Sequence, residues 1–224
     1  DLIYNMACNM GGMGFIENNK ADCMLSVLIN TNLLRASLVH KIKKYFFSSS
    51  ACVYNGTKQE KIFIQGLKES DAYPANPELT YGWAKLIGEK AVEAATVENE
   101  NLNVAIARFI GIYGPNQDYK LETGSVIPVF SHRAIKYPEI PFNVWGTGKE
   151  TRSYCFIDDA LDCIETMILD LDNRQLVGPY NVGKDERVSI EEIARTVYGV
   201  AGKCGFVQMK ITDRKLKRLI KNVW

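Results

Sequence analysis

The chain has 224 residues, 46% of them hydrophobic, which is enough to bury one substantial core or a core with a smaller lobe. Its 27 basic and 26 acidic residues leave a net charge of +1, which excludes a strong overall field for nucleic acid or an anionic membrane. No apolar run approaches the roughly 20 residues of a membrane-spanning helix, and no signal peptide opens the sequence. We therefore expect a cytoplasmic protein that binds neither nucleic acid nor membrane.

The cysteines show no metal-binding pattern. There are six of them, without any CxxC spacing, and only two histidines accompany them. We expect reduced thiols and no metal site. The cysteines are Cys8, Cys23, Cys52, Cys155, Cys163 and Cys204.

The first 50 residues alternate between strand and helix patterns. Residues 1–7 predict a strand, and a glycine-rich turn follows at residues 11–14. Apolar residues at helical spacing then predict one long helix over residues 16–39. Residues 44–48 are aromatic and short, which predicts a buried strand with a serine-rich exit.

The same alternation continues after a loop. Residues 55–80 carry charges, prolines and glycines in no steady period, which indicates a loop. Residues 81–99 predict a helix and residues 104–107 a strand. Strand, helix, strand, helix, strand is the pattern of a doubly wound parallel sheet, in which ligands bind at the carboxyl ends of the strands. We expect those ends at Cys8, Ser50 and Arg108.

Beyond Pro115 the pattern is typical of a smaller lobe. Helices are predicted near residues 126–136, 157–169 and 189–200, the last two capped by Asp158 and Ser189. An extended segment at 141–145 precedes a tight turn at 146–148, and a basic helical end is expected at 213–221.

Tyr81 and Lys85 are the first candidates for chemistry. On a helix, residues four apart lie on one face, so the ammonium can lie near the phenol. A nearby cation lowers the pKa of a phenol and suits it to accept a proton from a hydroxyl group. This spacing also arises by chance, and the alternative is a surface contact between the two side chains.

A serine cluster at residues 48–50 supports the pair. It follows a predicted strand and precedes Tyr81 by some thirty residues, so its hydroxyls can bind a substrate hydroxyl or ketone. Ordinary turn chemistry is the alternative for these serines. Cys52 follows directly, either as a reactive thiol or as a small buried side chain.

The order of these landmarks resembles that of extended short-chain dehydrogenase/reductases, the NAD-dependent epimerase/dehydratase family. The resemblance is carried by Tyr4-Asn5-Met6-Ala7, the serine cluster, Tyr81-Gly82-Trp83-Ala84-Lys85, Arg108-Phe109, Ile112-Tyr113-Gly114-Pro115, Thr151-Arg152-Ser153 and Phe156-Ile157-Asp158. It covers nearly the whole chain. Within the family, Met10-Gly11-Gly12-Met13-Gly14-Phe15-Ile16 and Ser49-Ser50-Ala51-Cys52-Val53-Tyr54 are most similar to the GDP-mannose 3,5-epimerases, and the GDP-fucose synthases are next.

The resemblance implies a fold and an activity. It implies that residues 1–115 form the C-terminal part of a Rossmann-like dinucleotide-binding domain. Residues 116–224 would form mainly the α/β substrate-binding lobe, with the chain crossing back to the sheet near 153–183. The implied enzyme is an NAD-dependent nucleotide-sugar epimerase that acts through a transient 4-keto sugar, and the implied assembly is a homodimer.

The resemblance also implies roles for particular residues. The implied catalytic residues are Tyr81, Lys85, Ser50 and the base Cys52. NAD would contact Ala7, Ser49, Tyr81 and Lys85. The nucleotide sugar would contact Gly11, Ser50, Arg133, Glu150, Thr151 and Arg152. Arg133 is alternatively a solvated helix charge.

Two departures leave the reaction open. The family's epimerising acid, a lysine or histidine, falls near Ser125, where this chain has neither, and Lys120 does not match the spacing. Gly111 stands where the 3,5-epimerases carry an asparagine. The alternatives are another NDP-sugar 4-epimerase or dehydratase, an epimerase-reductase similar to the GDP-fucose synthases, and a non-catalytic sugar-nucleotide-binding fragment.

The sequence also leaves the cofactor type open. Residues 11–14 follow a later strand and lack the GxxGxxG spacing of a dinucleotide-binding turn. We therefore expect the chain to be an N-terminally truncated fragment of such an enzyme. NAD is the expected cofactor, although the acidic residue that separates NAD from NADP is not identified.

Overall fold

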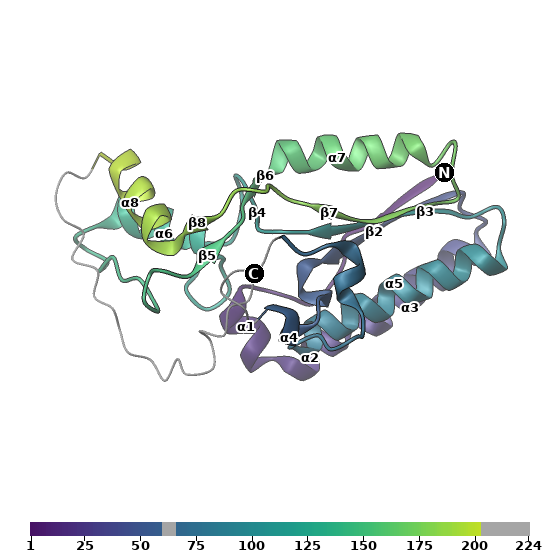
Figure 1. Cartoon of the computed structure of the whole chain (residues 1–224), viewed down its shortest axis with the longest axis horizontal. Coiled ribbons are helices and arrows are strands. Elements are labelled where there is room, and N and C mark those ends of the chain that lie inside the picture. The colour runs from purple at the N-terminus through teal and green to yellow at the C-terminus, as the bar shows by residue number, and fades with distance from the viewer. Residues whose placement is uncertain (60–65, 203–224) are drawn as a thin grey trace.

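A computed structural model describes residues 1–59 and 66–202 of the chain. It shows an elongated molecule with a parallel sheet between helices and a smaller lobe at one end (Figure 1). The prediction for Cys204 and the basic helical end predicted at 213–221 lie outside the described residues.

The central sheet has four parallel strands in the order β1-β2-β3-β7. They are β1 (Leu2–Asn5), β2 (Lys44–Ser50), β3 (Asn103–Phe109) and β7 (Leu176–Val182). Asn5 pairs with Phe47 and Ser50 pairs with Phe109, so the carboxyl ends of these strands share one edge of the sheet. The predicted fold class is confirmed.

Two strands differ from the sequence pattern. β2 continues through Ser50, so the serine cluster belongs to the strand and not to its exit. β7 was not predicted as a strand, because Gly178, with φ +96°, and Pro179 interrupt it. The pairing of β3 with β7 shifts register between Ala105 and Ala107 to accommodate them.

Helices cover both faces of the sheet. α3 (Ser26–Val39) and α5 (Thr80–Glu98) pack on one face and α7 (Ile157–Asp170) on the other (Figure 1). Each face buries its own apolar cluster. One cluster includes Tyr45, Phe47, Val92, Leu102, Val104 and Ile106, and the other Phe46, Ala105, Ala107, Ile164, Met167 and Val177.

The single long helix predicted over 16–39 is wrong. The segment forms α1 (Met13–Asn18), α2 (Lys20–Met24) and α3. Asn19, at φ −122° and ψ 49°, separates α1 from α2, and its side-chain amide donates to the carbonyl of Phe15 at 2.9 Å. An asparagine amide that competes for a backbone carbonyl favours a helix end, which the apolar periodicity does not report.

The predicted loop over 55–80 contains short helical segments. They are α4 (Gly56–Gln59) and the 3₁₀ helix η2 (Glu69–Ala72), and a second 3₁₀ helix, η1 (Ala51–Val53), precedes them. The side-chain amide of Asn55 donates to the carbonyl of Pro74 at 2.6 Å, which closes the segment on itself.

The lobe is built around α6 (Val126–Lys136) and α8 (Ile190–Val200), whose core includes Phe130, Phe142 and Tyr198. Two short strand pairs lie near the lobe. β5 (Thr151–Arg152) pairs with β8 (Val188–Ser189). β4 (Ile112–Tyr113) pairs with β6 (Cys155–Phe156) beside α7. The Ser189 cap is confirmed, since its hydroxyl accepts from the amide of Glu192 at 3.1 Å. The Asp158 cap is wrong: Phe156 is the N-cap and Asp158 lies in the first turn.

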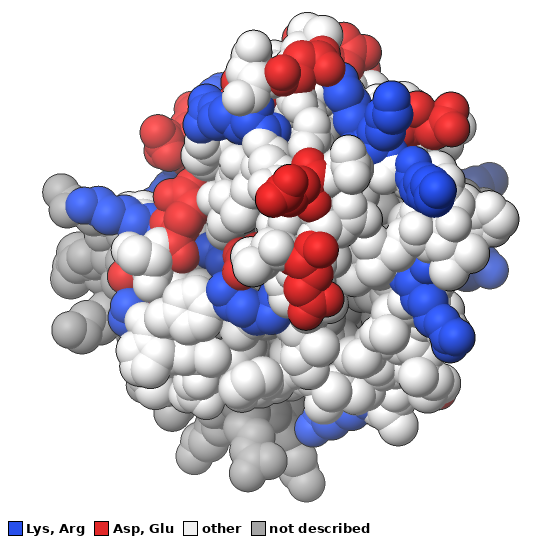
Figure 2. All heavy atoms as spheres, turned by 90° about the vertical axis from the view of Figure 1, so that its right-hand side faces the viewer, with Lys and Arg blue, Asp and Glu red and all other residues white. Residues whose placement is uncertain are grey.

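Charges of both signs are mixed over the face at the amino ends of the strands, and uncharged residues fill most of its lower part (Figure 2). Within the described ranges no helix is both long enough and apolar enough to cross a membrane.

Candidate active site

The candidate site lies where β2 ends and α5 begins. η1 follows β2 directly, and the first turn of α5 packs against η1. A Cβ on Gly82 would stand 2.0 Å from the carbonyl oxygen of Cys52, so only glycine permits this approach. The glycine next to Tyr81 therefore brings the start of α5 onto the segment that carries Cys52.

Tyr81 is buried, with 4% of its surface exposed. It packs against Ile16 and Cys23, and the half-buried Cys8 and Cys52 border the same cluster. Its hydroxyl donates to the thioether sulfur of Met10 at 3.4 Å, a weak acceptor. A substrate hydroxyl could replace that contact at small cost.

Lys85 is also buried, with 2% exposed, one turn after Tyr81. Its ammonium donates to the carbonyl oxygen of Ser48 at 2.6 Å and to the Ser48 hydroxyl at 3.3 Å. The Nζ atom lies 5.9 Å from the centre of the Tyr81 ring. The structure thus brings Tyr81 and Lys85 together, and the surface-contact alternative is excluded for this pair.

Ser50 and Cys52 stand beside the pair. Ser50 caps η1 by accepting from the backbone amide of Cys52 at 3.2 Å, and it also forms a hydrogen bond with Tyr81. Burial raises the pKa of the Cys52 thiol, while Ser50 and the charges of Lys85 and Arg152 act to lower it. Burial therefore favours the protonated form of the Cys52 thiol.

The electrostatics of Tyr81 differ from the sequence prediction. Burial raises the pKa of Tyr81 well above its ordinary value, and the neighbouring Cys52 and Cys8 add to this rise. Burial lowers the pKa of Lys85, against opposing interactions with Cys8, Cys52 and Glu89. The expected lowering of the phenol pKa by Lys85 is absent, because desolvation outweighs the charge of an ammonium that is bonded to Ser48.

Arg152 is the residue of the lobe that approaches this site. It is half-buried in β5, burial lowers its pKa, and its charge acts on the Cys52 thiol. Within the chain its guanidinium donates to the carbonyl of Thr151 at 2.9 Å, which leaves other donors for an anion.

The other predicted substrate residues have contacts within the lobe. Glu150 accepts from the amide and hydroxyl of Thr147 at 3.1 Å each, and hydrogen bonds of this kind hold its pKa low although burial opposes them. Thr151 pairs with Ser189 between β5 and β8. The buried Arg133 donates to the carbonyl of Asn143 at 2.6 Å, so it is not a solvated helix charge.

The glycine turn joins the sheet to the lobe. The amide of Gly12 donates to the carbonyl of Thr123 at 2.5 Å, and a Cβ on Gly12 would stand 2.3 Å from the carbonyl oxygen of Gly124. Gly11 lies beside Thr123 in the same contact, and the amide of Ala7 is held by the side chain of Asn5 at 3.2 Å. Because these glycines have no side chains, they let the two backbone segments approach closely.

The structure supplies no acid at the expected position. Ser125 and Lys120 are both exposed, and Ser125 is the N-cap residue that precedes α6. A pocket of about 290 Å³ lies beside α6, where the rings of Tyr119 and His132 stack with centres 4.6 Å apart. None of the predicted catalytic residues lines this pocket, so it is separate from the Tyr81 cluster.

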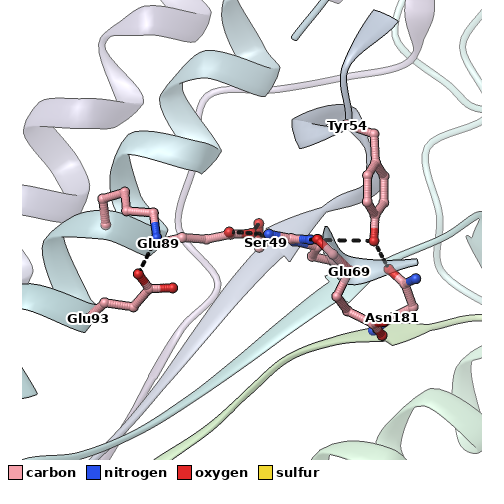
Figure 3. A network of polar contacts seen from close by, with 8 residues as sticks. Ser49, Tyr54, Glu69, Glu89, Glu93 and Asn181 are labelled. Carbon is pink, nitrogen blue, oxygen red and sulfur yellow. Dashed lines mark hydrogen bonds and ion pairs between the residues drawn. The ribbon is translucent and has the colours of Figure 1, made fainter. Parts of the chain in front are cut away.

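Sequence reasoning missed several residues around the pair. Met10, Cys8 and Ser48 contact Tyr81 or Lys85, and their positions just after β1 and within the serine cluster were the available signals. Glu89 and Arg108 form a buried ion pair next to Ser49 (Figure 3). The spacing of four residues from Lys85 to Glu89 places both on one face of a helix and could have indicated that Glu89 lies near the pair.

Comparisons with known proteins identify the families that the chain resembles. The family model described as the NAD dependent epimerase/dehydratase family matches residues 1–183. GDP-mannose 3,5-epimerase of Arabidopsis thaliana is 37% identical over 88% of this chain and 51% of its own length. GDP-L-fucose synthase 1 of the same plant is 29% identical over 94% of this chain and 66% of its own length. The chain spans about half the length of the 3,5-epimerases it matches.

A solved structure supports the fold. The UDP-glucose 4-epimerase of Thermus thermophilus, in complex with NAD, superposes with a TM-score of 0.73 and 23% identity. The match covers 92% of this chain and 64% of that one. The doubly wound sheet with its lobe is therefore shared with an epimerase of known structure.

Proposed function

The chain belongs to the NAD-dependent epimerase/dehydratase family, and from this premise we propose that it carries the catalytic centre of a nucleotide-sugar epimerase. The observation that carries the proposal is the convergence of Tyr81, Lys85, Ser50 and Cys52 at the carboxyl edge of the sheet.

Tyr81 is the proposed acceptor of the proton from the sugar hydroxyl at C4. Its hydroxyl is held only by a thioether and by Ser50, so a substrate hydroxyl can take the place of the Met10 contact. Ser50 would bind the same sugar oxygen and align it with the phenol. Lys85 would support the phenolate through its charge, since it stands one helical turn away and is held by Ser48.

The residues present fit the nicotinamide half of NAD. Lys85 donates twice to Ser48, and its remaining contact is with the weakly accepting Cys8 thiol, which a ribose hydroxyl can replace. The Tyr81 hydroxyl is also available. Both stand at the carboxyl ends of parallel strands, where dinucleotides bind in such folds. When bound, NAD supplies the hydride acceptor and a positive charge that favours the phenolate. Ala7 and the backbone of Ser49 complete the proposed contacts.

The lobe would hold the nucleotide sugar. Arg152 offers free guanidinium donors to the diphosphate beside Cys52, and Gly11 lets the backbone approach the sugar. Glu150, Thr151 and Arg133 would shape this pocket from the contacts they already make inside the lobe.

GDP-mannose 3,5-epimerisation is the reaction we propose first. The 37% identity to the plant enzyme and the presence of Cys52 beside Tyr81 support it. Cys52 would remove the proton next to the 4-ketone once the thiolate forms. The test is incubation of the chain with NAD and GDP-mannose in deuterium oxide. Deuterium at both C3 and C5 is expected, and the absence of exchange at both carbons would exclude this reaction.

A second candidate is an NDP-sugar 4-epimerase or dehydratase. The exposed Ser125, where an acid is needed, favours a reaction without 3,5-inversion. Retained C3 and C5 hydrogens with a changed C4 configuration would identify the 4-epimerase, and a 4-keto product that has lost its C6 hydroxyl would identify the dehydratase. Tight binding of a GDP-sugar with no turnover in the presence of NAD would instead identify a non-catalytic sugar-nucleotide-binding role.

We propose a homodimer that joins through α3 and α5. Met24, Leu25, Leu28, Ile29, Trp83 and Ile87 on these helices and just before α3 are partly exposed apolar side chains. Analytical ultracentrifugation should give twice the chain mass, and Leu28→Glu with Ile87→Glu should give a monomer. The five described cysteines are free thiols, which is typical of a reducing compartment, so we propose the cytoplasm.

A further inference from the structure

A buried polar network lies directly behind the catalytic pair. Tyr81, Lys85 and Glu89 follow one another at intervals of four residues on α5, so they share one face of the helix. Glu89 has no exposed surface and Arg108 on β3 has 1%. Their ion pair therefore stands in the interior, between the catalytic helix and the sheet.

Both carboxylate oxygens of Glu89 accept hydrogen bonds from the sheet. Arg108 donates from Nε to Oε1 at 2.9 Å and from Nη2 to Oε2 at 2.7 Å, in the two-pronged geometry of a strong pair. The hydroxyl of Ser49 donates to the same Oε1 atom. The Glu89 carboxylate on α5 therefore accepts hydrogen bonds from both β3 and β2 (Figure 3).

The other end of Arg108 is also fixed. Its Nη1 donates to the carbonyl of Glu69 at 2.7 Å and lies 3.5 Å from the hydroxyl of Tyr54, which bonds to Asn181 on β7. Figure 3 shows these contacts as a continuous row from Glu89 to Asn181. An arginine held at both ends cannot swing away, so it fixes the carboxylate of Glu89 in turn.

Ser49 lies between the two serines that touch the catalytic pair. Ser48 supplies both acceptors of the Lys85 ammonium, and Ser50 bonds to Tyr81. If Ser49 were released, the end of β2 could shift relative to α5, and the acceptors of Lys85 would shift with it. Hydrogen bonds to the charged form of a lysine raise its pKa, so their loss would lower it further.

We infer that Glu89 and Arg108 are positioning residues, which act through Ser49 to hold the end of β2 against the Tyr81–Lys85 face of α5. The effect on turnover rests on the proposed function, but the effect on the ionisation of Lys85 does not. This role uses the Ser49 hydroxyl, so only the backbone of Ser49 remains for the cofactor contact predicted from the family.

The experiment compares Ser49→Ala with Glu93→Gln in the full chain. Ser49→Ala removes one hydroxyl and leaves the Glu89–Arg108 pair intact. Glu93→Gln alters a carboxylate on the same helix whose partner, Lys90, is largely exposed. The titration of the Lys85 Nζ group is followed by NMR of chain labelled with ¹⁵N-lysine, with the signal assigned by its loss in Lys85→Met.

We expect Lys85 to lose its proton at lower pH in Ser49→Ala than in wild type, and at an unchanged pH in Glu93→Gln. Turnover should fall about 10- to 100-fold in Ser49→Ala with KM changed less than about twofold, since displacement of an aligned group acts on the chemical step. An unchanged Lys85 titration in a folded Ser49→Ala overturns the inference. If wild type shows no turnover, the proposed function fails while the titration still decides the positioning role.

Discussion

The sheet region and the lobe are stabilised in different ways. Of the buried polar and charged side chains in the described ranges, all but Arg133 lie in the sheet region or the segments attached to it. The lobe core consists of aromatic and aliphatic side chains such as Phe130, Phe142 and Tyr198. Apolar packing is enough to hold the lobe together, whereas the region that carries the proposed catalytic pair uses directional bonds that fix each polar group.

Their ion pairs show the same contrast. The Glu89–Arg108 pair is buried inside the sheet region, whereas the Glu191–Arg195 pair on α8 is exposed to solvent. In the exposed pair, Nη2 of Arg195 lies 2.7 Å from Oε1 of Glu191. Water and ions screen the exposed pair, and the buried pair has no such screening. The two pairs therefore contribute differently to stability although their ion-pair distances are equal.

The largest expected effect is on the reaction. Tyr81→Phe should lower turnover about 10²- to 10⁴-fold, because it removes the proton acceptor while the ring still fills its buried site. Tyr137→Phe in the lobe, whose ring packs edge-on against Tyr198, should leave turnover within about twofold. Steady-state kinetics with a nucleotide sugar measures both, and equal losses in the two variants would refute the separate roles of the regions.

Next come the two ion pairs. Glu89→Gln should lower the free energy of unfolding by about 3–5 kcal/mol, because Arg108 is left as an uncompensated buried charge. Glu191→Gln should lower it by less than about 1 kcal/mol. Urea unfolding followed by circular dichroism measures both values. A loss below about 1 kcal/mol in Glu89→Gln would mean that the interior pair is solvated.

A cavity in the lobe should act locally. Phe142→Ala removes a ring that packs 5.2 Å from Phe130 and 5.5 Å from Tyr198, at an expected cost of about 3–5 kcal/mol. Hydrogen exchange should quicken in α6 and α8 and stay unchanged in β2 and β3. Faster exchange in the sheet strands by the same factor would show that the two regions unfold as one unit.

The smallest effect tests the junction of the regions. Burial raises the pKa of Cys52, so its thiolate fraction at pH 8 is lower than that of an ordinary thiol and should keep rising at higher pH. Arg152 of the lobe opposes this rise, and Arg152→Gln should slow alkylation of Cys52 further. Peptide mapping after iodoacetamide treatment measures the rate, and the exposed Cys163 is the control thiol. If Arg152→Gln left the alkylation rate of Cys52 unchanged, the charge of Arg152 would have no effect on the pKa of the thiol.

The strands and helices of the sheet region were predictable because their patterns are regular. β2, β3 and α5 have continuous apolar or periodic faces, and their predicted positions are confirmed to within a few residues. β7 was missed because Gly178 and Pro179 interrupt it, and α1 was merged with α2 because the side-chain amide of Asn19 ends a helix. Periodicity reports which face is buried and does not report where a side chain captures a carbonyl.

The sequence by itself determined which residues stand together at the centre: Tyr81 and Lys85 by helical spacing, and Ser50 and Cys52 by their place at the end of a strand. Only the tertiary structure decided the pKa values of Tyr81 and Lys85. Burial raises the pKa of Tyr81 and lowers that of Lys85, opposite to the expectation from the pair alone. Desolvation depends on everything packed around a group, such as Ile16 of α1 and Cys23 of α2 around Tyr81, and no local pattern in the chain contains that information.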